Sequence, residues 1–268
     1  MKEEGLKDEK ELQSYFISRI EKFLISKNRK LIGWDEILEG GISPEATVMS
    51  WRGVKGGIEA AHLGHNVVMT PTTYAYIDYT QGDPSVDPPI YANLRMKKSY
   101  SFNPVPEGVD AKFILGGQGN LWTEQLPTLR SAFYMTYPRA WALAEVFWTP
   151  NELKNWDNFV QRVEHQFQYF DMAGLNYSRA IYDAIVRVYM KEGNMWVELE
   201  PEIAGLDLYY TIDGTMPDNF SPKFTKPVLI PEGPVTMRVV TYRNGSPIGH
   251  MIILTPEQLK RRAGNGDE

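Results

Sequence analysis

The 268-residue sequence lacks cysteine, so disulfides, thiolate metal ligands and cysteine nucleophiles are excluded. It also lacks any run of about 18 apolar residues, so no membrane-spanning helix is expected. The chain has no excess of positive charge, because its 28 Lys and Arg residues are outnumbered by 34 Asp and Glu residues. The resulting net charge of −6 argues against a general nucleic-acid binder, which needs a basic surface. The first twelve residues are charged and lack the apolar core of a signal peptide, so we expect no export signal in this polypeptide.

Apolar and aromatic residues are plentiful. Hydrophobic residues make up 43% of the chain and charged residues 23%, which is enough apolar material for a packed core. At roughly 150 residues per domain, the length predicts one large or two unequal domains. The 7 Trp, 15 Tyr and 11 Phe residues are mostly expected in the core, although aromatic faces also stack on sugar rings.

Residues 1–176 alternate between short apolar runs and helical patterns. Helices are predicted at 8–26, 53–63, 128–146 and 155–170, and strands at 30–34, 47–51, 66–70 and 112–115, with a long loop at 71–108. Nearly all-apolar strands alternating with helices are typical of a parallel α/β sheet. Four such strands would make half of an eight-stranded barrel or a small open sheet.

The texture changes after residue 176. Five short segments rich in β-branched and aromatic residues are separated by turn residues, which predicts an all-β module. We expect this module to be a small sandwich covering residues 177–258. The remaining residues, 259–268, form a polar tail that we expect to fray.

The carboxyl ends of the predicted parallel strands carry the candidate site, because functional residues collect there in α/β folds. Trp34, Trp51 and Trp122 follow three of the four strands. A single Trp usually belongs to the core, but three at equivalent positions favour a pocket wall. Tyr76 follows the remaining strand and could complete that wall.

Carboxylates accompany these aromatic residues. Asp78 and Glu124 could hydrogen-bond sugar hydroxyls or an amide, although each could equally cap a helix or join a salt bridge. Asp35 and Glu36 precede a predicted helical turn, so capping is the favoured role for them.

Four motifs in this order, GWDEIL, VMSWRG, PTTYAYIDY and GGQGNLWTE, resemble the carboxyl-terminal half of the catalytic barrel of family 20 glycoside hydrolases. These enzymes are the β-N-acetylhexosaminidases. Pro138-Arg139-Ala140 followed by Ala144-Glu145 resembles the last barrel helix of the family, and the segment 209–217 is similar to a β-sandwich appended to bacterial members. The resemblance implies the C-terminal half of a TIM (β/α)8 barrel, residues 1–176, followed by the small sandwich.

The family implies substrate-assisted retaining catalysis, in which the sugar's own acetamide oxygen attacks the anomeric carbon. By resemblance, Trp34, Trp51 and Trp122 would cage the acetamide and the ring, and Tyr76 would orient the acetamide as the one catalytic contribution of this chain. Asp78 and Glu124 would bind sugar hydroxyls. The implied partner is an oligosaccharide or glycan that contains N-acetylhexosamine, of either the gluco or the galacto type. No cofactor and no metal are expected, since the four histidines form no metal-ligand spacing.

The family's catalytic Asp-Glu pair, within H-x-G-G-D-E, is absent. We therefore expect the chain to be a truncated C-terminal portion that lacks the general acid and is inactive alone. A half-barrel leaves strand edges unpaired, so self-association is expected. The parent enzyme would be periplasmic or secreted by analogy with bacterial members. Two alternatives remain, namely a non-catalytic N-acetylhexosamine-binding protein and a small α/β enzyme that uses Asp35, Glu36 or Glu124.

Overall fold

The computed structural model describes Met1 and residues 4–264. The chain divides into two compact units, each assembled from separate stretches of sequence. The first unit comprises residues 1–77, 98–122 and 140–154, and the second comprises residues 78–97, 123–139 and 155–268.

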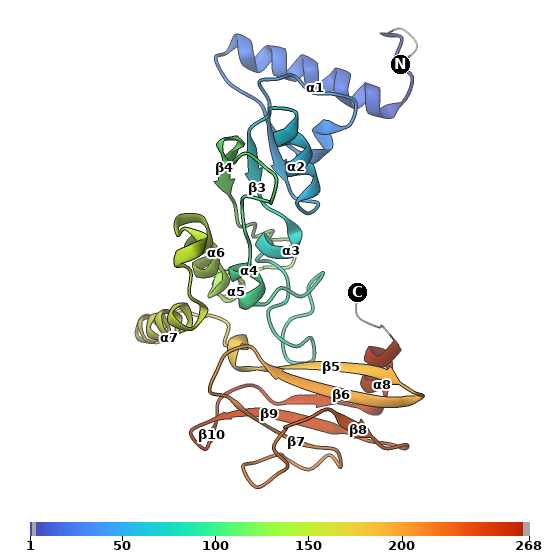
Figure 1. Cartoon of the computed structure of the whole chain (residues 1–268), viewed down its shortest axis with the longest axis vertical. Coiled ribbons are helices and arrows are strands. Elements are labelled where there is room, and N and C mark those ends of the chain that lie inside the picture. The colour runs from blue at the N-terminus through green and yellow to red at the C-terminus, as the bar shows by residue number, and fades with distance from the viewer. Residues whose placement is uncertain (2–3, 265–268) are drawn as a thin grey trace. The chain divides into compact units, whose positions relative to one another are not determined.

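A four-stranded parallel sheet forms the centre of the first unit (Figure 1). Its strands are β1 (Ile32–Trp34), β2 (Thr47–Ser50), β3 (Val67–Met69) and β4 (Ile114–Gly117), paired in that order. The predicted parallel sheet is thus confirmed. β4 begins two residues later than expected, because Asp110 caps a 3-10 turn at Ala111–Phe113 by accepting a hydrogen bond from Lys112 N.

The core of this unit is formed by buried residues of the sheet and of the helix that follows β2. Val48, Val67 and Met69 of the sheet are fully buried, as is Ala60 of helix α2 (Lys55–His62). The start of α2 is tied to the end of β2, since the Ser50 hydroxyl accepts a hydrogen bond from the Gly57 amide at 2.8 Å and donates one to the Gly53 carbonyl. These two hydrogen bonds fix the loop between β2 and α2, and this loop begins at Trp51.

Helix α1 (Glu9–Ser26) starts where Asp8 accepts a hydrogen bond from the Glu11 amide, as expected for an N-cap. Much of its apolar surface is exposed rather than packed. The exposed apolar residues of α1, β1 and β4 are Leu12, Phe16, Ile20, Phe23, Ile25, Ile32 and Leu115. Folding of this chain alone therefore leaves an apolar surface uncovered in the first unit.

The single helix predicted over 128–146 is wrong. The chain instead forms α5 (Leu129–Thr136) and α6 (Arg139–Trp148), separated at Tyr137 and Pro138. Proline lacks the amide hydrogen that a continuous helix needs, and it biases the preceding residue toward extended backbone. Tyr137 adopts that conformation, with φ −106° and ψ 138°. The predicted loop at 71–108 also contains two short helices, α3 (Thr72–Ala75) and α4 (Met96–Tyr100).

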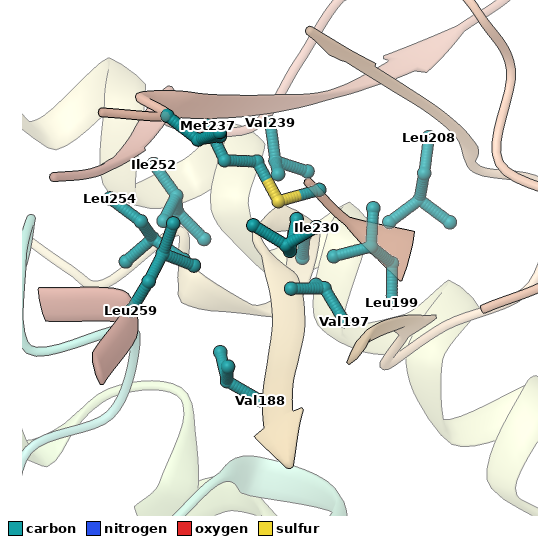
Figure 2. Close-up of a cluster of buried hydrophobic side chains, with 12 residues drawn as sticks. Val188, Val197, Leu199, Leu208, Ile230, Met237, Val239, Ile252, Leu254 and Leu259 are labelled. Atoms are coloured by element: carbon teal, nitrogen blue, oxygen red, sulfur yellow. The ribbon is translucent and has the colours of Figure 1, made fainter. Parts of the chain in front are cut away.

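The second unit contains helix α7 (Trp156–Ala173) and two antiparallel sheets. One sheet pairs β5 (Ala184–Lys191), β6 (Asn194–Pro201) and β8 (Val228–Ile230), and the other pairs β9 (Met237–Arg243) with β7 (Asp207–Thr211), β10 (Ser246–Pro247) and β11 (Ile252–Leu254). The prediction missed β8 and β10, which are short. Both sheets contribute to one core, in which Val197, Met237 and Val239 are fully buried (Figure 2).

Helix α8 (Pro256–Gly264) corrects the expected polar tail. Its Leu259 is 1% exposed and packs in the core shared by the two antiparallel sheets, which together with the turns around them (residues 180–254) are called the β region. Only Leu259 and Ala263 of α8 pack on this core, and the other side chains of the helix are mostly charged or polar, so the sequence pattern of this stretch indicates a polar tail. Residues 265–268 of the predicted tail lie outside the described residues. The predicted domain boundaries at residues 176 and 258 stay predictions. No described helix combines the length and apolar character needed to cross a membrane.

Candidate functional site

The first unit gathers the four predicted aromatic residues into two pairs. Trp34 ends β1, and Trp122 lies beyond β4, with their ring centroids 5.9 Å apart. Trp51 directly follows β2, and its ring stacks on Tyr76 with centroids 6.3 Å apart and an interplanar angle of 28°. Because the strands are parallel and adjacent, their carboxyl ends share one edge of the sheet, as predicted.

Backbone hydrogen bonds hold the segment after β3 against the segment after β4. The Ile77 amide donates to the Asn120 carbonyl, and the Asn120 amide donates to the Ala75 carbonyl, both at 2.8 Å. The Asn120 side chain is buried and donates to Thr70 Oγ1. Gly119 leaves room for the Leu143 side chain, since a Cβ at that position would lie 2.8 Å from Leu143 Cδ1. The loops that carry Tyr76 and Trp122 are thereby fixed against each other.

Asp35 and Glu36 do not cap the turn that follows β1, so that prediction is wrong. Asp35 is buried, and its carboxylate accepts hydrogen bonds from the amides of Trp51 and Arg52 and from Arg52 Nε. The Glu36 carboxylate accepts the Trp51 indole N–H, at 2.9 and 3.1 Å to its two oxygens. Together these carboxylates fix both the backbone and the ring of Trp51.

Sequence reasoning missed this role, although a signal for it was present. Glu36 and Trp51 follow strands that are neighbours in the sheet, so their side chains meet at its carboxyl edge. The indole N–H of a tryptophan can only donate a hydrogen bond, so it needs an acceptor from another residue. A carboxylate at the end of the adjacent strand is well placed to be that acceptor.

The second unit contains the two remaining predicted residues, Asp78 and Glu124. Asp78 is 1% exposed, and its buried Oδ1 accepts no hydrogen bond within the part of the chain that the structure describes. Burial raises the pKa of Asp78 to about 6, and the negative charge of Glu124 adds to the rise. Hydrogen bonding to its own backbone and the charge of Arg139 oppose the rise without cancelling it. Glu124 itself is exposed.

A buried carboxylate oxygen without a partner is unusual in a folded protein, because leaving it unpaired is unfavourable. Such an atom is suited to accept a hydrogen bond from a ligand hydroxyl. Paired aromatic rings provide apolar faces of the kind that cover a sugar ring. Among the described residues, no group of three or more His, Asp and Glu side chains is arranged to hold a metal ion. The expectation that no cofactor is used stays a prediction.

Comparisons with known proteins give the family. Residues 1–151 match the model of the catalytic domain of glycosyl hydrolase family 20, and residues 197–251 match the family described as Fn3 associated. A β-hexosaminidase of Porphyromonas gingivalis is 48% identical over 182 residues, covering 66% of this chain and 23% of that protein. A β-hexosaminidase of Vibrio furnissii is 32% identical over 154 residues, covering 54% of this chain and 25% of that protein.

A solved structure agrees with these matches. An exo-β-N-acetylglucosaminidase from Vibrio harveyi, determined with N-acetylglucosamine, superposes with a TM-score of 0.62 and 30% identity. The match covers 67% of this chain and 29% of that protein, so the chain spans roughly a quarter of the length of these relatives. On the family match over residues 1–151, which is more than half of its length, the chain belongs to glycosyl hydrolase family 20.

Proposed function

We propose that this chain is the C-terminal part of a β-N-acetylhexosaminidase and that it supplies the aromatic sugar and acetamide pocket of that enzyme. The reaction is hydrolysis of terminal β-linked N-acetylhexosamine with substrate-assisted retention of configuration. The observation that carries the proposal is the pairing of Trp34 with Trp122 and of Trp51 with Tyr76 at one edge of the parallel sheet.

The strand order supports assignment of the sheet to half of a (β/α)8 barrel. Each of the four strands pairs in parallel with the strand that follows it in the sequence. A closed barrel has this consecutive strand order throughout, whereas in a doubly wound open sheet the order of strands across the sheet reverses at a switch point. In this proposal the two antiparallel sheets of the second unit form the appended sandwich.

The mechanism assigns each aromatic residue a task. The acetamide carbonyl oxygen of the substrate attacks the anomeric carbon, the bond to the leaving oxygen breaks, and an oxazolinium forms. Trp34, Trp51 and Trp122 enclose the acetamide methyl group and the ring, which holds the oxygen near the carbon it attacks. The Tyr76 hydroxyl donates a hydrogen bond to the acetamide oxygen and aims it. Water then opens the oxazolinium with overall retention.

The polar residues fix the sugar's pose. Asp78 accepts a hydrogen bond from a ring hydroxyl through its Oδ1, which has no hydrogen-bond partner among the described residues, and Glu124 accepts another. The acid that protonates the leaving oxygen is not among the 268 residues, since no H-x-G-G-D-E motif occurs in them. Asp35 and Glu36 are adjacent carboxylates that follow a strand, but their hydrogen bonds to Trp51 and Arg52 occupy them structurally.

The test is hydrolysis of p-nitrophenyl N-acetyl-β-glucosaminide, together with calorimetric titration of N-acetylglucosamine. We expect binding without turnover, and loss of binding in Trp122→Ala. Turnover that disappears in this variant would show that the acid lies within the chain. Absence of any binding would contradict the pocket assignment.

A non-catalytic N-acetylhexosamine-binding protein is the alternative, favoured by the same absence of the acid motif. Adding a separately produced segment that carries H-x-G-G-D-E distinguishes the two. Restored turnover supports the enzyme, and unchanged binding without turnover supports the binding protein.

Self-association belongs to the same proposal. The exposed apolar residues of α1, with Ile32 on β1 and Leu115 on β4, form surface that the other half of a barrel would cover. Without that half, we expect oligomers in size-exclusion chromatography with light scattering. A stable monomer at high concentration would contradict the half-barrel assignment.

A further inference from the structure

Residues 78–97, which we call the Asp78 loop, belong to the second unit together with the β region and helix α8. The loop contains no strand and only the first residues of α4. A 20-residue segment with so little regular structure has a large entropic cost of ordering, so its conformation must be fixed by contacts to other elements. Its first residue is Asp78, the candidate ligand for a sugar hydroxyl.

The first such contact joins the loop to α8. Asp83 is buried, and its two carboxylate oxygens accept hydrogen bonds from the two terminal nitrogens of Arg262, each at 2.7 Å. This is the bidentate geometry in which a guanidinium fixes both the position and the orientation of a carboxylate. The same carboxylate accepts the Ser85 amide and hydroxyl, so the turn after Asp83 is held with it.

A second contact fixes the other end of the loop to the β region. Arg95 donates to the buried Glu202 at 3.1 Å and to the carbonyls of Ala180 and Ala184. The other oxygen of Glu202 accepts the Lys97 amide at 2.8 Å. Between the two ends, the loop closes on itself, because the Asp87 carboxylate accepts the backbone amides of residues 81 and 82, each at 2.7 Å.

Buried charged pairs of this kind are weak sources of net stability, since desolvation offsets most of the attraction. Such pairs fix the position of the segments that carry them, because separating the two side chains would leave a buried charge unpaired. We propose that Arg262 and Arg95 are positioning residues, through which helix α8 and the β region hold the Asp78 loop so that Asp78 presents its free oxygen to a sugar hydroxyl. The inference rests on the proposed function of Asp78. Under this proposal, the β region and α8 take part in substrate recognition by holding the Asp78 loop.

The test compares Arg262→Gln with Arg261→Gln in the full chain. Arg261 is the neighbouring exposed arginine of α8, so the control removes the same charge without touching Asp83. Arg262→Lys keeps the charge but loses the bidentate geometry, and its behaviour should be intermediate. Near-ultraviolet circular dichroism and thermal unfolding establish that each variant is folded.

Two readouts are taken on each folded variant. Carbon-13 titration of the Asp78 carboxyl reports its environment without any ligand, and hydrogen exchange reports the protected loop amides, such as those of Gln81 and Leu94. In Arg262→Gln we expect the Asp78 titration to move toward that of a solvated aspartate and loop exchange to accelerate about tenfold or more, with Arg261→Gln unchanged. An Arg262→Gln protein with wild-type titration and exchange overturns the inference.

Calorimetry with N-acetylglucosamine then separates this inference from the proposed function. If the wild type binds, Arg262→Gln should bind about tenfold more weakly, and equal affinity overturns positioning. If the wild type does not bind, the proposed function fails for this chain. The titration and exchange results still decide whether α8 holds the loop. Should Arg262→Gln not fold, Arg262→Lys carries the same comparisons, and wild-type behaviour in all of them overturns the inference.

Discussion

Replacing Asp78 by asparagine should stabilise the protein at neutral pH. Burial raises the pKa of Asp78 from 3.8 to about 6. Between those values the folded state binds a proton that the unfolded state has released, so the free energy of unfolding falls as pH rises. The pKa rises by about two, and a change of one in pKa corresponds to about 1.4 kcal/mol, so the free energy of unfolding is lower by ~3 kcal/mol at pH 7. The Asp78→Asn variant has no carboxyl to ionise at this position and should not show this loss.

The assay is urea unfolding of wild type and Asp78→Asn at several pH values from 3.5 to 7.5. Other groups titrate in both proteins, so the difference between their free energies of unfolding isolates Asp78. This difference should grow in favour of the variant through the interval between pH 4 and 6 and reach a plateau above it. Asp213→Asn is the control, because hydrogen bonds from Thr215 lower the pKa of that exposed carboxyl. Its difference should change with pH in the opposite direction.

A difference that does not vary with pH would refute the claim that Asp78 is a desolvated carboxyl. A bound sugar should also change the ionisation of Asp78. A sugar hydroxyl that donates to Asp78 favours the ionised carboxylate, so N-acetylglucosamine should lower the Asp78 pKa. Affinity should correspondingly rise as pH increases through about 6. Calorimetry at pH 5 and pH 7.5 measures this, and equal affinities at the two values would contradict it.

Two further predictions concern the first unit. Glu36→Ala should release the Trp51 indole and weaken N-acetylglucosamine binding about fivefold to tenfold. Glu36→Gln should retain most of the affinity, because its side chain keeps an acceptor for the indole N–H. Tryptophan fluorescence titration measures both variants, and equal losses of affinity would count against a hydrogen-bond role. Gly117→Ala should destabilise the fold by about 1–3 kcal/mol, since its Cβ would overlap the Phe147 ring, whereas Gly264→Ala meets no atom and should be neutral or slightly stabilising. Urea unfolding compares these two, and a stabilised Gly117→Ala would show that the ring moves freely.

The parallel sheet was predictable because its strands are nearly continuous apolar runs. Val48 and Val67 are fully buried, and such runs have one stable environment, the interior of a covered sheet. The aromatic site was predictable for the same reason, since strand ends in a parallel sheet converge on one edge. Trp34 and Trp51 could be placed from the positions of their strands alone.

Other features depend on contacts that sequence periodicity does not encode. Helix α8 has one buried anchor, Leu259, and its placement depends on a core built by distant strands. The free oxygen of Asp78 and the bond between Glu36 and Trp51 are properties of three-dimensional neighbours. Pro138 was visible in the sequence, but whether a proline kinks or ends a helix is decided by the backbone of the residue before it.

The interleaved composition of the second unit has a consequence for the order of events during synthesis. Arg262 lies 179 residues after Asp83 in the sequence. A ribosome adds about 5–20 residues per second, so the Asp78 loop leaves the exit tunnel well before the helix that carries Arg262. During that interval Asp83 has no Arg262 with which to pair, and its carboxylate stays solvated. The bidentate pairing of Asp83 with Arg262 therefore forms only after helix α8 has been made.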